Sequence, residues 1–69
     1  MSAVMFKPRV WVMVRRGKKG YGVYVQTPDG REFLLKTHKG FSEAARSARK
    51  EARWWEGQGY PVSLVGLEG

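Results

Sequence analysis

The segment from residue 9 to residue 16 alternates cationic, aromatic and sulfur-containing side chains with valines. Arg9, Trp11, Met13 and Arg15 occupy one set of alternate positions, and three valines occupy the other. Guanidinium groups bind phosphate oxygens, and the flat face of an indole stacks on a base or packs against a sugar. This spacing therefore favours the binding of a polyanion that carries flat, apolar groups.

A second group of cations follows directly, in the run Arg-Arg-Gly-Lys-Lys-Gly at positions 15–20. We expect Arg16, Lys18 and Lys19 to lie with Arg15 on a flexible hairpin tip, which follows a phosphate backbone without selecting a base. The run lacks the Gly-x-x-x-x-Gly-Lys-Ser/Thr spacing of a nucleotide-binding loop, and the Gly-Tyr-Gly that overlaps its end is too short for a dinucleotide fingerprint. A nucleotide pocket is not expected.

Residues for catalysis or metal binding are scarce. His38 is the only histidine and the chain has no cysteine, so no second imidazole or thiolate is present to build a metal site or a nucleophile–base pair. His38 falls at the end of a predicted strand and is expected at the surface. Asp29 belongs to a predicted turn, and the pattern indicates no carboxylate pair. We therefore expect a protein that is not an enzyme and that needs no cofactor or metal ion.

The net charge of the 69-residue chain is +7, and its distribution is uneven. Residues 1–40 hold nine basic and two acidic side chains, whereas residues 41–69 hold four of each. The whole excess therefore belongs to the first part of the chain. Because such an excess opposes folding slightly through self-repulsion, a polyanionic partner is its simplest explanation. Nucleic acid is favoured over an acidic membrane or an acidic protein, and the alternative is a basic protein that is merely soluble.

Alternation of apolar residues predicts two strands joined by a tight turn in this basic part. The first covers residues 9–16 and the second residues 21–27, and the glycines at both ends of the turn can adopt positive φ. The two valines of the second strand point one way, while Tyr24 and Gln26 point the other. Tyr24 and Gln26 should therefore share a face with Trp11.

A Thr-Pro-Asp-Gly turn at residues 27–30 predicts the next hairpin, because proline presets φ at the second position and glycine accepts the left-handed conformation. The third strand is predicted over residues 31–38. Phe33 and Leu35 are expected on the valine side, against the helix. Lys36 is expected on the opposite side, with the aromatic residues, although a leucine interrupts the alternation.

An amphipathic helix is predicted after Gly40, with Ser42 as its N-cap, Glu43 near the positive end of its dipole and Gly57 at its end. Its apolar stripe, with spacings of three and four, consists of Phe41, Ala45, Ala48, Ala52 and Trp55. A second stripe consists of Arg46, Lys50 and Arg53. We interpret this basic stripe as a solvated helix face supported by ion pairs with the helix glutamates.

Residues 60–67, with a proline near the start, predict a short final edge strand. The expected fold is therefore α+β: a three-stranded antiparallel sheet with one helix packed on one face, plus a short C-terminal strand, in the order β-β-β-α-β. A chain of this length holds one domain, here residues 1–69.

Ten residues on the uncovered sheet face and the first hairpin are the predicted nucleic-acid contacts. They are Arg9, Trp11, Met13, Arg15, Arg16, Lys18, Lys19, Tyr24, Gln26 and Lys36. A simpler explanation of Trp11 and Tyr24 is a cross-strand pair that stabilises the sheet, and the two roles are compatible.

From Tyr24 to about Glu51 the chain resembles the arm-type DNA-binding domain of tyrosine-recombinase integrases, which is related in fold to the plant AP2 domain. The resemblance lies in an aromatic strand around Tyr24, the Pro-Asp-Gly hairpin, a strand that ends in Lys36-Thr37, the Lys39-Gly40-Phe41 segment and an alanine-rich helix. It implies a three-stranded sheet that lays its exposed face into the DNA major groove. Trp11, Tyr24, Gln26 and Lys36 would face the groove, and the hairpin lysines would contact the backbone.

Two features depart from that family. No recombinase core follows, so an integrase is not expected, and the predicted strand over residues 62–67 is foreign to the pattern. A strand after the helix is more similar to β-β-β-α-β proteins such as HicB-type antitoxins, which bind proteins. In size and basicity alone the chain is similar to small archaeal chromatin proteins, which coat DNA with little sequence preference.

DNA is the favoured partner, largely without sequence specificity, in a chromatin, viral or regulatory role. RNA or single strands are alternatives, as is a protein-interaction module such as an antitoxin-like or virus-encoded regulator.

No run approaches the roughly 20 apolar residues of a membrane span, and Met1 to Lys7 lack the pattern of a signal peptide. We expect a cytoplasmic protein, associated with the nucleoid if it is a chromatin protein, and either a monomer or a homodimer. The lack of asparagine and cysteine is typical of a thermophile.

Overall fold

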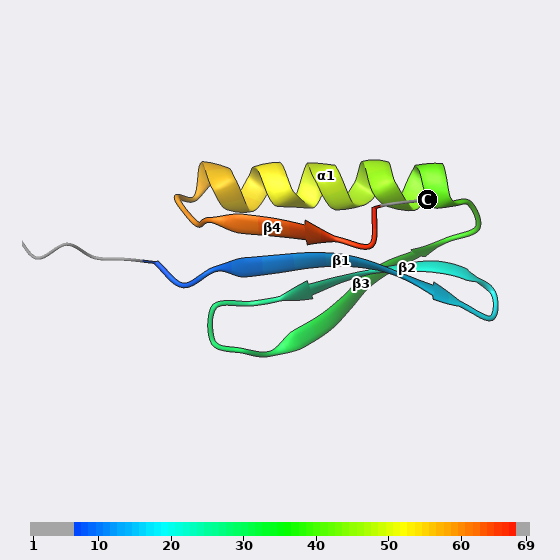
Figure 1. The fold of residues 1–69 in the computed structure, drawn as a ribbon, viewed down its shortest axis with the longest axis horizontal. Helices are drawn as coiled ribbons and strands as arrows, with labels where there is room; N and C mark the ends of the chain where they lie inside the picture. Colours follow the sequence, from blue (N-terminus) through cyan, green and yellow to red (C-terminus); the bar gives the residue numbers. More distant parts are fainter. Residues whose placement is uncertain (1–6, 68–69) are drawn as a thin grey trace, which may run out of the picture.

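The computed structural model describes residues 7–67 of the chain. Its elements are β1 (Val10–Gly17), β2 (Gly20–Gln26), β3 (Glu32–His38), α1 (Phe41–Gly57) and β4 (Val62–Val65), drawn in Figure 1. The predicted α+β class and the β-β-β-α-β order are confirmed. Residues 1–6, which make up most of the segment in which no signal peptide is expected, lie outside the described residues, as do residues 68–69.

The strands form one four-stranded mixed sheet in the order β3-β2-β1-β4. The first three strands pair antiparallel, and β4 pairs with β1 in parallel after the chain has passed through α1. The final strand therefore extends the sheet beside β1. Figure 1 shows α1 lying along one side of this sheet, with the other side uncovered by any element of the described chain. We call the uncovered side the open face.

The core lies between α1 and the valines of the two central strands. Valines of β1 and β2 and alanines of α1 are buried together, and they are Val10, Val12, Val14, Val23, Val25, Ala44, Ala48 and Ala52. Small alanine side chains let the helix approach the branched valines closely. Two edge-on aromatic pairs close the ends, Phe41 with Tyr21 (ring centroids 5.5 Å apart) and Trp55 with Tyr60 (5.3 Å).

β3 lies largely outside this core. Phe33 and Leu35 are 47% and 43% exposed, because α1 packs mainly over β1, β2 and β4. The expectation that both residues are covered by the helix is therefore wrong.

The expected N-cap of the helix is also wrong. α1 begins at Phe41, so Gly40 is the N-cap and contributes no side-chain hydrogen bond, and Ser42 lies inside the first turn. The predicted position of Glu43 in that first turn is confirmed.

α1 ends at Gly57, as expected, but the left-handed glycine that closes the helix lies two residues further on. Gly59, with φ of +92°, adopts the left-handed conformation, whereas Gly57 remains helical. The Gly59 N–H donates to the Glu56 carbonyl, and the Tyr60 N–H donates to the Trp55 carbonyl. These two bonds, together with the contact of the Trp55 and Tyr60 rings, form a Schellman motif.

A β-bulge in β3 reverses the side-chain directions in the second half of the strand. Tyr24 pairs with Leu34 but Val23 pairs with Lys36, so Leu35 is an extra, bulged residue. Bulges re-aim the side chains that follow them. Leu34, which precedes the bulge, lies on the open face beside Tyr24. Lys36, which follows the bulge, lies on the helix side, where it lines a hollow with Lys50 of α1. The expectation that Lys36 shares the open face with the aromatic residues is wrong for this reason.

Candidate functional site

Six of the ten predicted contact residues lie on the open face. They are Arg9, Trp11, Met13 and Arg15 from β1 and its approach, and Tyr24 and Gln26 from β2. β3 and β4 add residues that are not among the ten predicted contacts, and they are Glu32, Leu34, Ser63 and Val65. Glu32 pairs with Gln26, and Ser63 pairs with Trp11, so these residues lie beside the predicted contacts.

Arg15 is the central charged residue of the open face, and it already has an acidic partner. Its guanidinium donates from Nη1 to Glu32 Oε2 and from Nη2 to Glu32 Oε1, both at 2.8 Å. To reach β3 from β1 it crosses β2, where its Cζ lies 4.7 Å from the centre of the Tyr24 ring. This cation–π contact and the two-pronged ion pair fix the guanidinium across three strands. The hydrogen bond from Arg15 lowers the pKa of Glu32 below its ordinary value, and it raises the pKa of Arg15.

Replacing Glu32 with glutamine is expected to remove part of the acid sensitivity of the fold. Because the folded-state pKa of Glu32 is depressed, its contribution to stability is complete above its ordinary pKa of 4.5 and is lost as the pH falls through the folded value. Chemical unfolding at a series of pH values from neutral to acidic should show a shallower decline in stability for Glu32→Gln than for wild type. Parallel declines would show that the ion pair contributes nothing measurable.

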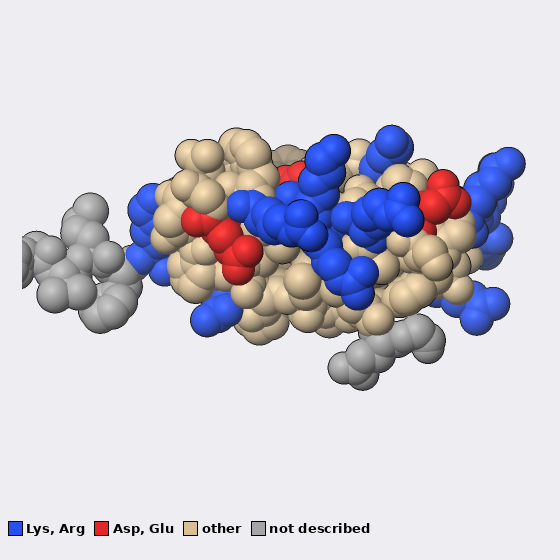
Figure 2. Space-filling model, turned by 90° about the horizontal axis from the view of Figure 1, so that it is seen from above, with Lys and Arg blue, Asp and Glu red and all other residues tan. Residues whose placement is uncertain are grey.

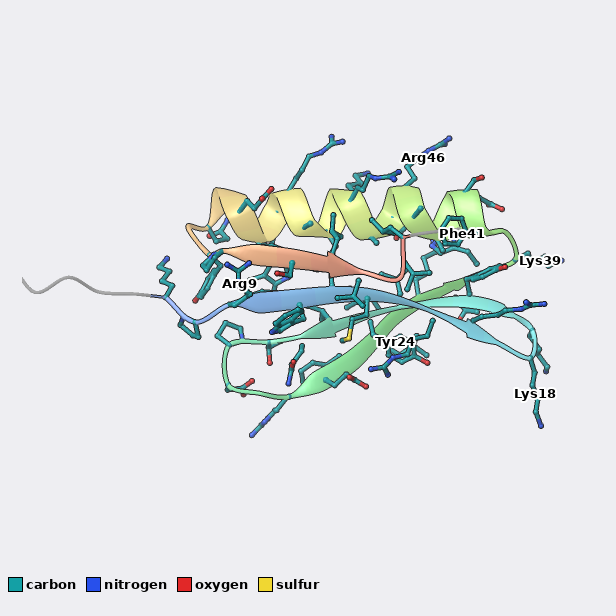
Figure 3. The ribbon with its side chains drawn as sticks, in the orientation of Figure 1. Arg9, Lys18, Tyr24, Lys39, Phe41 and Arg46 are labelled. Carbon is teal, nitrogen blue, oxygen red and sulfur yellow. The ribbon has the colours of Figure 1, made fainter. Side chains whose placement is uncertain are left out.

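The turn of the first hairpin carries two lysines that form no ion pair in the described chain. Gly17 pairs with Gly20, which leaves Lys18 and Lys19 as the two exposed residues of the turn. Figure 3 shows the Lys18 side chain pointing away from the layer that α1 forms. Arg16 pairs with Tyr21, so strand alternation places its exposed side chain on the helix side of the hairpin.

A hollow of about 360 Å³ lies at this end of the sheet, lined by residues 15–20 together with Gly22, Tyr24 and Thr37. The Tyr24 ring lies over Gly22, because a Cβ atom on Gly22 would come within 2.8 Å of it. The absence of a side chain at Gly22 therefore lets the ring lie flat along the sheet. The hollow brings an aromatic ring and the hairpin lysines together at one place.

The far end of the open face holds Arg9 and Trp11. Arg9 Nη1 donates to Ser63 Oγ at 2.8 Å, which ties the guanidinium to β4, and no carboxylate of residues 7–67 forms an ion pair with it. Trp11 is 39% exposed. Within residues 7–67, Trp11 and Tyr24 are not among the ring pairs in contact, so the cross-strand pair suggested as a simpler explanation is not formed.

Ion pairs on the helix were expected, but none forms within residues 7–67. Only Arg15 with Glu32 and Arg31 with Asp29 approach within 4 Å in the described part of the chain. The basic stripe of α1 is therefore not neutralised by the helix glutamates. Figure 2, which looks onto the helix side, shows Lys and Arg gathered across the middle of the molecule and acidic side chains toward its ends.

His38 is half-buried, not a surface residue as expected, and its Nε2 has no hydrogen-bond partner among residues 7–67. No group of three or more His, Asp or Glu side chains in that range could hold a metal ion, and no helix there is long and apolar enough to cross a membrane.

Comparisons with protein-family models, curated protein sequences and solved structures found no match to the chain. The resemblance to arm-type domains therefore stays a prediction.

Proposed function

We propose that the chain is a small DNA-binding domain with little sequence preference that contacts the duplex through its first hairpin and the open face. The observation that carries this proposal is the hollow that Tyr24 lines together with Lys18 and Lys19, two lysines that form no ion pair within residues 7–67. The lysines would neutralise phosphates and release counterions, which is the main source of non-specific affinity. Arg9 would extend this contact along the sheet.

The state of Arg15 supports low sequence specificity. A free arginine fork that reads the O6 and N7 atoms of guanine is the commonest specific contact in the major groove. Both prongs of Arg15 are occupied by Glu32, so the open face lacks such a reader at its centre. The partly exposed Trp11 and the Tyr24 ring then offer contacts with sugars and bases that do not depend on the base pair.

Fluorescence anisotropy tests this function with duplex DNA, single-stranded DNA and RNA of equal length, each at low and moderate salt. The duplex is expected to bind, with an affinity that falls steeply as salt rises. Tighter binding of single strands would shift the proposal toward stacking on unpaired bases. Failure of all three nucleic acids to bind at low salt would refute it.

Replacing Trp11 with serine is expected to weaken binding of single-stranded DNA roughly tenfold, because stacking on an aromatic residue contributes about 1–3 kcal/mol per base. The loss on duplex DNA should be smaller, because paired bases are less accessible to the ring. Anisotropy titrations with both substrates measure the two effects, and a thermal melt checks the fold. An unchanged single-strand affinity would exclude Trp11 from the contact surface.

A protein-interaction module is the second candidate, and exposed apolar residues at both sheet edges favour it. Phe33, Leu34 and Leu35 of β3 are 47%, 54% and 43% exposed, and Leu64 and Val65 of β4 are 40% and 44% exposed. Unpaired edge strands with apolar side chains are suited to strand addition. Under this alternative, replacing Arg15, Arg16, Lys18 and Lys19 with serine would leave partner binding intact. Under the DNA-binding proposal the same change abolishes retention on DNA.

A further inference from the structure

Four cations form a ridge along the exposed side of α1, opposite its buried alanines. They are Arg46, Arg49, Lys50 and Arg53, all exposed, and we call them the helix ridge. Their spacing of three, four and seven residues gathers them on one face of the helix, whereas the buried alanines occupy the other. Arg46 to Arg53 spans about 10 Å of helix axis, a length that matches about three phosphates along one DNA strand.

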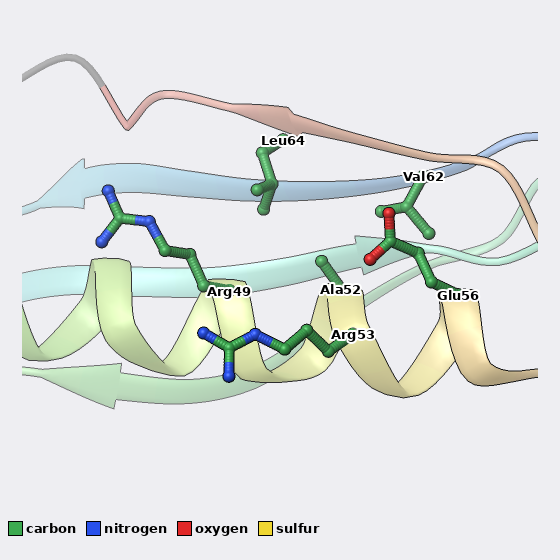
Figure 4. A pocket seen from close by; sticks show the side chains of 6 residues that line it. All are labelled: Arg49, Ala52, Arg53, Glu56, Val62 and Leu64. Carbon is green, nitrogen blue, oxygen red and sulfur yellow. The ribbon is translucent and has the colours of Figure 1, made fainter.

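The cations of the helix ridge form no ion pair with the glutamates of the described chain. No carboxylate in residues 7–67 lies within 4 Å of a ridge cation. Glu51 accepts a hydrogen bond of 3.1 Å from Trp55 Nε1. Figure 4 shows the guanidinium groups of Arg49 and Arg53 pointing in the same direction, while the Glu56 carboxylate lies toward Val62 of β4.

The bulge in β3 adds a further cation to this side of the molecule. Lys36, re-aimed by the extra residue Leu35, lines a hollow of about 290 Å³ with Arg46 and Lys50 of the ridge. The other lining residues are His38, Ser47 and Glu43, and Glu43 is the only acidic one. The cationic surface therefore extends from α1 onto the edge of the sheet.

We propose that the helix ridge is a second contact surface for a duplex backbone, and that one molecule thereby bridges two duplex segments. The inference rests on the proposed DNA binding through the first hairpin. Figure 3 shows Arg46 and Lys18 pointing in opposite directions, away from the two layers of the fold. A straight duplex that lies against the hairpin and the open face does not reach the ridge, so the ridge takes a second segment.

A two-duplex capture assay tests bridging. One duplex is immobilised on beads, protein is added until it is bound, and retention of a second, fluorescent duplex is measured. The ridge variant is Arg46→Gln with Arg53→Gln, in which glutamine preserves helix propensity. The matched control is Lys7→Gln with Arg31→Gln, which removes the same charge from exposed positions outside the ridge and the hairpin. It also removes the contacts of Lys7 with the Gln58 carbonyl and Tyr60 and the ion pair of Arg31 with Asp29, so its thermal stability is compared with that of wild type. Affinity for a single duplex and thermal stability are measured for all proteins.

Wild type and the control are expected to capture the second duplex, and the ridge variant is expected to capture at least about tenfold less because it loses two phosphate contacts. Its affinity for a single duplex should stay within about threefold of the control. Equal capture by the ridge variant and the control would overturn the inference. Wild type that binds one duplex but captures no second would also overturn it, while the proposed function stands. A wild type that binds no duplex would overturn both.

Discussion

Replacing Lys18 and Lys19 with glutamine is expected to weaken duplex DNA binding roughly 30-fold at about 0.1 M salt, because each phosphate contact accounts for close to one power of the salt concentration. The two lysines are exposed, have no acidic partner in the described chain and flank the hollow that contains Tyr24. Because they form the turn between paired glycines, their loss should leave the strands intact. Anisotropy titration against a fluorescent duplex measures the change.

The control for this variant is the double replacement of Lys7 and Arg31 with glutamine, which lowers the net charge equally. Its affinity should stay within about threefold of wild type, because long-range attraction is screened beyond about 10 Å at this salt concentration. If both variants lose affinity equally, the binding depends on net charge alone and the hairpin has no special role.

Replacing Gly20 with alanine is expected to destabilise the fold by about 3 kcal/mol, which corresponds to a fall of roughly 12–24 °C in Tm for a domain of this size. Gly20 has φ of +142°, a conformation that residues with a side chain rarely adopt. A Cβ atom there would lie 2.2 Å from the His38 carbonyl oxygen at the end of β3. The added methyl group should therefore push the first residue of β2 away from the last residue of β3. Thermal and chemical unfolding measure the loss.

Gly57→Ala provides the matched comparison. Gly57 is the last residue of α1, and a Cβ atom there would meet nothing within 4 Å. Alanine should therefore leave stability unchanged or increase it by up to about 1 kcal/mol. If Gly20→Ala unfolds at the same temperature as Gly57→Ala, the close approach of β2 and β3 is not a constraint on the fold.

The architecture was predictable from the sequence because local signals agreed with one another. Alternating valines defined β1 and β2, the Pro-Asp-Gly turn placed Gly30 in the left-handed region (φ of +89°), and spaced alanines defined the buried side of α1. The sequence did not reveal that the final strand pairs in parallel with β1. Strand pairing between distant segments depends on the path of the helix over the sheet, which local patterns do not encode.

The candidate site was predictable only where alternation is regular. The extra residue Leu35 reverses the side-chain direction in β3, so Lys36 lies on the helix side, and no turn signal or glycine marks the bulge. Glu32 could have been placed opposite Gln26 by counting from the turn. Its pairing with Arg15 could not, because the register sets Glu32 level with Trp11 and the ion pair depends on the direction in which the Arg15 side chain crosses β2. That the helix ridge forms no ion pair within residues 7–67 depends on side-chain directions that spacing alone does not define.

The dependence of duplex affinity on salt concentration tests the proposed mechanism most directly. With about four phosphates contacted, a plot of log K against log salt concentration for wild type should have a slope of about −4. The slope for the Lys18→Gln, Lys19→Gln variant should be shallower by about two. A wild-type affinity that does not change with salt, or a variant slope equal to that of wild type, would contradict binding through the hairpin.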